Sequence, residues 1–263
     1  MSKFGKLAWV LVLGLLIAAL LLASILANAL ARAQAVVYTV SSRKLGAGMR
    51  LALISDLHSA RYGPRQDTLI DMLRDYAPDA VLLAGDIFDY DASFQNAVTL
   101  IERVGAEWPC YFVFGNHEHG TKELEKIRSL LEEAGITILE GDCLSFSKDG
   151  GSIVLAGVDD VRNSRRAYEA QLEAVGERLK DEESFSILLS HEPQFIDGLL
   201  ASGADLIVSG HTHGGQWSLP GIFNGLYAPG QGFFPKYAGG LYRFGDQSLI
   251  VSRGLAREPL CVP

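Results

Sequence analysis

The stretch "DLIVSGHTHGGQ", residues 205–216, decides how this chain folds and what kind of site it carries. An apolar run of strand character stops at Gly210, and two of the chain's six histidines, His211 and His213, follow one residue apart. A run that is apolar at successive positions suits a strand buried on both faces. Neither turn chemistry nor packing explains a histidine at both positions, so the pair indicates a need for imidazole nitrogens.

Five other segments repeat this pattern of a short apolar run that ends in a polar or glycine-rich turn. They are "LALISDLH" (51–58), "AVLLAGD" (80–86), "YFVFGNHE" (111–118), "IVLAGVDD" (153–160) and "SILLSHE" (186–192). Residues 67–79 and 122–135 show helical spacing of apolar residues, and 168–179 is compatible with a helix. The alternation predicts an α/β domain with a mixed or mostly parallel sheet, and the final third favours antiparallel strands.

Polar side chains follow these apolar runs at the point where each predicted strand ends. In open α/β sheets, ligands bind at the carboxyl ends of the strands, so we expect these side chains to lie close together. They offer carboxylate, amide and imidazole groups without a thiolate, which is a ligand set for divalent metal ions. The candidates are Asp56, His58, Asp86, Asn116, His117, His191, His211 and His213.

Each of these motifs has a simpler interpretation when it is taken alone. Asp56 and Asp86 suit caps of turns or helices, with His58 as a surface residue. Asn116 tolerates the left-handed geometry of a turn, and His191 suits a hydrogen-bonded core position. The histidine pair of the opening stretch resists such an explanation. Five motifs in order, all at predicted strand ends, favour one shared metal site.

The motifs resemble those of the calcineurin-like metallophosphoesterases, whose blocks run D-x-H, G-D, G-N-H-[DE], H and G-H-x-H. The resemblance extends from about Arg50 to Gly254 and leaves no metal-binding block unmatched. It implies a four-layer αββα sandwich with two divalent metal ions at the strand ends. Carried over block by block, it implies that the first ion is bound by Asp56, His58 and His213. The second would be bound by Asn116, His191 and His211, and Asp86 would bridge both.

The implied activity is the hydrolysis of phosphoric esters. Two adjacent divalent ions stabilise the attacking and leaving oxygens of a phosphoryl transfer. His117, beside the ligand Asn116, is expected to donate a proton to the leaving oxygen. Glu118 and Asp89 are interpreted either as acceptors that orient ligand histidines or as solvated acids. His119 matches no block and is interpreted as a surface residue. Manganese is the expected ion, and iron, zinc and nickel are alternatives.

The "GHTHGGQ" extension and the later "LYAPGQGFFPKYAGGLYRFG" are similar to a branch of membrane-associated phosphodiesterases and UDP-sugar lipid pyrophosphatases. The expected substrate is therefore a phosphodiester or pyrophosphate, including lipids of the cell envelope. A phosphomonoesterase and a non-catalytic metal-binding scaffold are the alternatives. Aromatic residues at 217–238 suggest either a loop that covers a lipid or base, or a loop anchored by its own rings. The chain departs from the branch by ending soon after "SRGL".

The amino-terminal region contains an uncharged segment, Leu7–Leu30, that is preceded by Lys3 and Lys6. Its length exceeds the roughly 30 Å of a bilayer core, which favours a transmembrane signal anchor over a cleaved signal or a buried helix. The expected organisation is an anchor at 1–30, a connector at 31–48 and a metallophosphoesterase domain at 49–263. The expected location is membrane-anchored with an extracytoplasmic catalytic domain, although the basic residues on both sides predict the orientation only weakly.

The net charge of −8 argues against a nucleic-acid partner, because such binding depends on clustered Lys and Arg. Several of the acidic residues are expected to face metal ions instead. The three cysteines, Cys110, Cys143 and Cys261, are far apart and show no zinc-ribbon spacing. A Cys110–Cys143 disulfide is an alternative to buried free thiols.

Overall fold

A computed structural model of the chain describes residues 9–19, 33–218 and 224–256. The compact unit spans Ala35–Ala256, and the helix at residues 9–19 belongs to a separate unit. All six predicted strand segments form strands. In chain order the strands are β1 Leu51–Ile54, β2 Ala80–Ala84, β3 Cys110–Val113, β4 Thr137–Ile138, β5 Cys143–Lys148, β6 Gly151–Gly157, β7 Phe185–Leu189, β8 Leu206–Ser209, β9 Tyr227–Ala228, β10 Gly232–Phe233, β11 Gly240–Phe244 and β12 Gln247–Val251.

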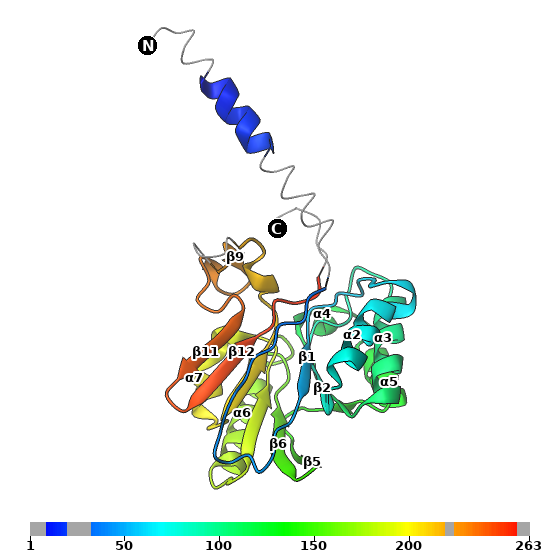
Figure 1. The fold of residues 1–263 in the computed structure, drawn as a ribbon, viewed down its shortest axis with the longest axis vertical. Coiled ribbons are helices and arrows are strands. Elements are labelled where there is room, and N and C mark those ends of the chain that lie inside the picture. Colours follow the sequence, from blue (N-terminus) through cyan, green and yellow to red (C-terminus); the bar gives the residue numbers. More distant parts are fainter. Residues whose placement is uncertain (1–8, 20–32, 219–223, 257–263) are drawn as a thin grey trace. The chain divides into compact units, whose positions relative to one another are not determined.

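The strands form two main sheets (Figure 1). The first has the order β1-β2-β3-β4 and is parallel throughout. The second has the order β11-β12-β8-β7-β6-β5, with four parallel strands between two antiparallel edge strands. The mostly parallel α/β fold is therefore confirmed, and β11 and β12 form the antiparallel pair expected near the carboxyl end. A small two-stranded sheet pairs β9 with β10.

The helices lie on the flanks of the sheets, α2, α3 and α5 beside the first and α6 and α7 beside the second (Figure 1). Their bounds are α2 Asp67–Tyr76, α3 Gln95–Glu107, α4 Asn116–Gly120, α5 Leu124–Glu133, α6 Arg165–Leu179 and α7 Ile196–Ala201. Short 3-10 turns are η1 Pro64–Gln66, η2 Pro193–Phe195 and η3 His213–Gly215. The sequence predicts α2, α5 and α6 but not α3, whose Asn96, Thr99 and Gly105 weaken the helical signal.

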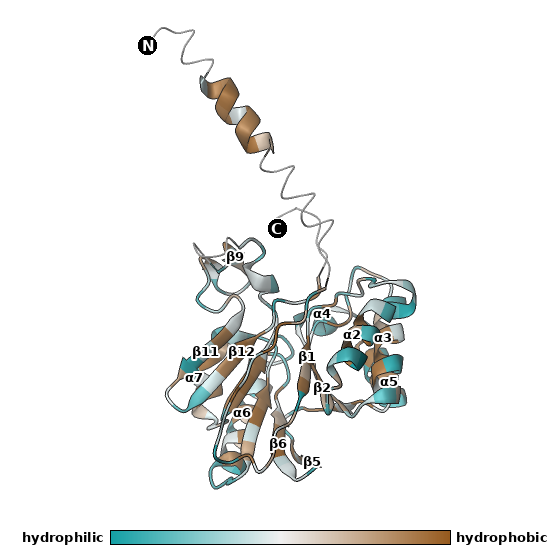
Figure 2. Cartoon of the chain, viewed as in Figure 1, coloured by the Kyte–Doolittle hydropathy of each residue, from teal (hydrophilic) through white to brown (hydrophobic). Residues whose placement is uncertain are grey.

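Alternate residues of the central strands bury two separate apolar layers. Leu82 of β2 and Val113 of β3 pack with Leu155, Ile187 and other residues of the second sheet. The intervening residues of β6, β7 and β8 pack against α6 and α7 instead. Because side chains alternate across a strand, each apolar run serves two layers at once. Figure 2 shows that the central strands are largely apolar, whereas the helices beside them mix polar and apolar residues.

The predicted membrane anchor is not supported by the structure. Within that segment the structure describes residues 9–19, which are helical. Across the described ranges no helix combines the length and apolar character needed to cross a membrane, which contradicts the predicted membrane localisation. The rest of the predicted segment, 20–30, lies outside the described residues.

The connector and the cysteines are also placed by the structure. Val40 and Leu45 of the connector pack against the apolar layer between the sheets, and Lys44 Nζ pairs with Asp205 at 3.0 Å. Cys110 and Cys143 are free thiols, so the alternative of a disulfide between them is excluded. Burial raises the pKa of Cys110 to about 12, which makes this thiol unreactive at neutral pH. Cys261 and the short carboxyl end lie outside the described residues.

Candidate metal centre

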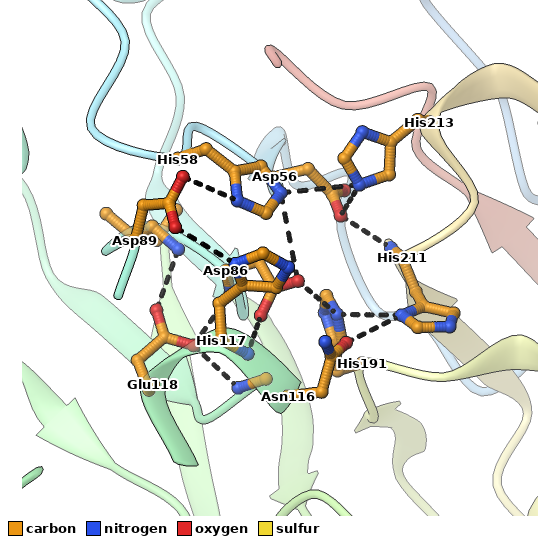
Figure 3. A network of polar contacts seen from close by, with 12 residues as sticks. Asp56, His58, Asp86, Asp89, Asn116, His117, Glu118, His191, His211 and His213 are labelled. Carbon is orange, nitrogen blue, oxygen red and sulfur yellow. Dashed lines mark hydrogen bonds and ion pairs between the residues drawn. The ribbon is translucent and has the colours of Figure 1, made fainter. Parts of the chain in front are cut away.

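The predicted site residues converge at one edge of the unit, where strands of both sheets end (Figure 3). The loops after β1 and β2 contribute Asp56, His58 and Asp86, and the first turn of α4, which follows β3, contributes Asn116 and His117. The loops after β7 and β8 contribute His191, His211 and His213. The structure thus brings every predicted ligand to this strand-end site, although the residues come from five segments and two sheets.

A first ligand group contains Asp56, His58, Asp86 and His213, whose ligand atoms all lie within 4.8 Å of one another. The Nε2 atoms of His58 and His213 are 3.3 Å apart. His213 Nε2 is 3.5 Å from Asp56 Oδ1, and His58 Nε2 is 3.8 Å from Asp86 Oδ2. The side chains of Asp56, His58 and His213 therefore face one another, and Asp86 lies beside them.

A second ligand group contains Asp86, His191 and His211, with Asn116 at its edge. Asp86 Oδ2 is 3.1 Å from His191 Nε2. His211 Nδ1 lies 2.8 Å from Asn116 Oδ1 and 3.3 Å from His191 Nε2. Asp86 belongs to both groups, and the same oxygen, Oδ2, faces both.

The partners of the two imidazole rings show which nitrogens face the second group. His191 Nδ1 donates to the Ala84 carbonyl at 2.7 Å, so Nε2 is the nitrogen that a neutral His191 offers to an ion. His211 Nδ1 faces Asn116 Oδ1 at 2.8 Å, and its Nε2 faces Glu192 Oε1 at 3.6 Å. Without an ion, the contact with the Asn116 oxygen requires a proton on Nδ1, and an ion bound to Nδ1 would require that proton on Nε2 instead.

This donor set fits divalent metal ions. Converging lone pairs repel one another unless a cation lies between them, and buried carboxylates are normally paired or coordinated to metal. Asp56 is fully buried, and its Oδ2 has no hydrogen-bond partner within the described ranges. Imidazole nitrogens with carboxylate and amide oxygens suit Mn, Fe, Zn or Ni.

His117 and Asp89 lie beside both groups. His117 is held at two points, because its backbone N–H donates to Asp86 Oδ1 at 2.8 Å and its Nδ1 lies 3.2 Å from Asp89 Oδ1. Asp89 Oδ2 also approaches His58 Nδ1 at 3.8 Å. Of the two interpretations of Asp89, the geometry therefore favours an acceptor that orients histidine rings. His117 Nε2 is left free of the Asp89 contact (Figure 3).

A model of the calcineurin-like phosphoesterase family matches residues 49–215 of this chain. The chain belongs to that family. The uncharacterized metallophosphoesterase YkuE of Bacillus subtilis is 31% identical over 81% of this chain and 74% of its own length. Phosphodiesterase YaeI of Escherichia coli is 27% identical over 80% of this chain and 76% of its own length. This phosphoesterase is thus a metal-dependent hydrolase of phosphoric esters.

The fold is also found in solved structures. A dimetal phosphatase from Danio rerio aligns with a TM-score of 0.54 at 14% identity, covering 80% of this chain and 89% of that one. At such low identity the likeness concerns the fold alone. It agrees with the two sheets and flanking helices described above.

Burial and charge set the protonation of the site of this phosphoesterase. Burial lowers the pKa of His211 to about 3 and also lowers the pKa of His58, which keeps both rings neutral. Burial by itself would raise the pKa of Asp86, but His191 and His58 offset it and hold that pKa well below its usual range. Burial lowers the pKa of His191, but Asp86 more than offsets this and raises it well above its usual value, so without a cation His191 is the protonated partner of Asp86. Because only a neutral imidazole binds metal, a bound ion must displace the proton from His191 Nε2.

The surroundings of Glu118 fit neither of its two predicted interpretations. It is fully buried, and its carboxylate accepts backbone N–H groups from Asp86, Ile87, Phe88 and Gly115 at 2.8–3.0 Å. It is neither a solvated acid nor an acceptor for a ligand histidine. It joins the loop after β2 to the loop after β3, and so fixes Asp86 relative to Asn116.

The prediction that His119 is a surface residue is wrong. Its side chain is 4% exposed, and Nε2 lies 2.6 Å from Asp159 Oδ1, which is equally buried. Asp159 belongs to the "GVDD" turn after β6, for which the sequence predicts no function. Glu192, which faces His211, also has no predicted role. In the sequence, Asp159 is marked only by its position after an apolar run, and Glu192 only by its position next to His191.

The backbone of the site is strained. Five of the predicted ligand residues have a left-handed φ, namely Asp56 (52°), His58 (47°), Asp86 (54°), His211 (70°) and His213 (49°). Such conformations cost about 1–3 kcal/mol each in non-glycine residues and cluster at functional sites. Gly85, with φ 79°, has no room for a side chain, since a Cβ would lie 2.6 Å from His191 Nδ1. The strained turns let each strand present its ligand at the common edge.

Proposed function

We propose that the chain hydrolyses phosphodiesters with two divalent metal ions held in sites that share Asp86. The observation that carries the proposal is that Asp86 Oδ2 faces both ligand groups, because a bridging carboxylate holds two like charges together. In this assignment the first ion is bound by Asp56, His58 and His213, and the second by Asn116, His191 and His211. Manganese is the proposed ion. When bound, such a pair lowers the pKa of a water molecule towards neutrality and stabilises charge on phosphoryl oxygens.

His117 is the proposed proton donor to the leaving oxygen. Asp89 accepts from Nδ1, which fixes the ring and leaves Nε2 to carry the proton that is transferred. The backbone bond from His117 to Asp86 Oδ1 keeps the imidazole beside the ligand groups. With 23% of its side chain exposed, His117 can be reached by a substrate and can be reprotonated from solvent.

The preference for diesters is supported by the similarity to an Escherichia coli protein named as a phosphodiesterase. The proposed catalytic domain is residues 49–263, with 31–48 as connector. A generic diester, the monoester p-nitrophenyl phosphate and a UDP-sugar lipid pyrophosphate distinguish the possible substrate classes. Faster hydrolysis of the monoester would make the enzyme a phosphomonoesterase, and no hydrolysis by the metal-loaded chain would favour the scaffold.

The decisive experiment measures the purified full chain with added Mn²⁺ on diesters whose leaving groups differ in pKa. His117→Ala should slow an alkyl diester by about 10²- to 10⁴-fold, the range for general acid catalysis. It should slow bis-p-nitrophenyl phosphate far less, because p-nitrophenolate leaves without a proton. An equal loss on both substrates would refute the role of His117. Lys122→Ala, an exposed change beyond α4, is the control and should leave both rates unchanged.

A further inference from the structure

Tyr90 stands at the rim of the strand-end site and has no part in the chemistry described so far. It follows Asp86 and Asp89 on the loop after β2. Its ring stacks on the His117 imidazole, with centroids 4.6 Å apart and planes inclined by 24°. His58 meets the same imidazole edge-on, with centroids 4.3 Å apart. The proposed proton donor therefore has an aromatic neighbour that extends its surface outward.

The position of the Tyr90 ring is fixed by its surroundings. A Cβ at Gly120 would lie 3.0 Å from Tyr90 Cδ1, so the ring packs directly against the end of α4. The loop itself is held by a turn in which Asp89 Oδ1 accepts the Asp91 backbone N–H at 3.1 Å. An aromatic side chain held in this way binds a planar partner without losing much conformational freedom.

The ring is nevertheless open to solvent. Tyr90 is 46% exposed, whereas Phe88 on the same loop is fully buried. Within the described part of the chain, no hydrogen bond to its hydroxyl group is found. The two carboxylates beside it, Asp89 and Asp91, would repel an additional phosphate group at this place. The surroundings therefore favour a neutral, planar group.

We propose that Tyr90 forms a subsite for the aromatic portion of a phosphodiester, such as an aryl group or a nucleobase, next to His117. The inference rests on the proposed function, because it takes the phosphoryl group to lie at the ligand groups. A ring held there packs against the exposed part of the Tyr90 ring, beside the His117 imidazole, and places its ester oxygen near His117. Tyr90 thereby determines specificity and is not itself a catalytic residue.

Direct binding of two non-hydrolysable ligands to the Mn²⁺-loaded full chain tests this subsite. Phenylphosphonate and methylphosphonate share the phosphonate group and differ only in the ring. Titration calorimetry measures the dissociation constant of each ligand. Tyr90→Leu should weaken the binding of phenylphosphonate about tenfold, which is within the range for the loss of one aromatic contact. The same change should alter the affinity for methylphosphonate less than about twofold. Tyr90→Phe should bind both ligands as the unaltered chain does.

Tyr76→Leu is the matched control, since Tyr76 is 48% exposed at the end of α2 and should affect neither ligand. Equal weakening of both ligands in Tyr90→Leu would mean that Tyr90 only positions His117, and unchanged binding would mean that the ring is not contacted; either result overturns the subsite. The binding measurement does not depend on turnover. Absence of diester hydrolysis would therefore count against the proposed function alone.

Discussion

Asp86 is the residue on which both ligand groups depend. Asp86→Asn keeps Oδ1 as the acceptor for the His117 backbone N–H but removes the charge that faces both groups. We expect diester hydrolysis to fall by more than about 100-fold, since even changes to residues behind a ligand cost 10- to 100-fold. Metal analysis should show fewer than two ions per chain. Asp71→Asn, an exposed acid on α2, is the control. Activity within tenfold of the original would argue against a shared ligand.

At this scale the sequence predicts which side chains converge at the strand ends, but it does not predict the residues that surround them. His58 and His213 can be recognised because each follows a buried strand in a short motif. The partner of His119 lies 40 residues away in the chain, and nothing in the sequence indicates that the two meet. The same holds for Glu192, whose contact with His211 arises only when β7 and β8 lie side by side.

The His119–Asp159 pair joins two elements, α4 and the loop after β6. We expect His119→Ala to lower the free energy of unfolding by about 3 kcal/mol, because it leaves a buried carboxylate without its partner. Burial lowers the pKa of His119, but Asp159 more than offsets this and raises it above its usual value. The stabilisation is thus complete below about pH 6.5 and is lost as the pH rises through the higher pKa of the folded state.

Urea unfolding at several pH values measures this effect. The difference in the free energy of unfolding between the original chain and His119→Ala should shrink as the pH rises above about 6.5. Lys126→Ala removes an exposed ion pair with Glu123 and should change stability by less than about 1 kcal/mol at every pH. A pH-independent difference for His119→Ala would show that packing, rather than the charge pair, joins the two elements.

Gly210 directly follows β8 and lies against the loop after β1. A Cβ at this position would lie 2.6 Å from both Asp56 Oδ2 and Ser55 Cβ, so Gly210→Ala must displace the loop that carries Asp56. We expect metal affinity to fall by at least about tenfold. Gly176→Ala in α6, where the nearest atom is 3.6 Å away, should instead stabilise the helix slightly. Unchanged metal affinity in Gly210→Ala would contradict this close approach.

The strands were predictable as elements because each is an uninterrupted apolar run, as in the fully buried β2. Helix α3 was not predicted, because polar residues interrupt the helical spacing of its apolar residues. The left-handed turns at Asp56 and Asp86 were not predictable either, since local preference opposes them. They exist because tertiary contacts outweigh that preference, for example the Asp56 N–H donating to the Gly85 carbonyl at 3.0 Å.

At the scale of the whole molecule, the proposed metal ligands follow strands of both sheets, so metal binding is expected to stabilise the fold. Asp56 and Asn116 come from the first sheet, and His191 and His213 come from the second. At about 1,000 times the dissociation constant, one bound ion adds about 4 kcal/mol, which corresponds to roughly 10 °C in the unfolding temperature of a chain this size. Calorimetry with Mn²⁺ and with a chelator should show this difference. Identical unfolding temperatures would mean that no metal spans the two sheets.

The apolar layer between the sheets also sets the distance between the two sets of loops that carry the proposed ligands. Leu82 and Val113 on one sheet meet Leu155 and Ile187 on the other, and the thickness of that layer sets how far apart the two sets of loops stand. The gap between ligands is therefore adjusted by the size of side chains that never touch a substrate. During evolution, a methyl group gained or lost in this layer would retune the metal centre without altering a single ligand.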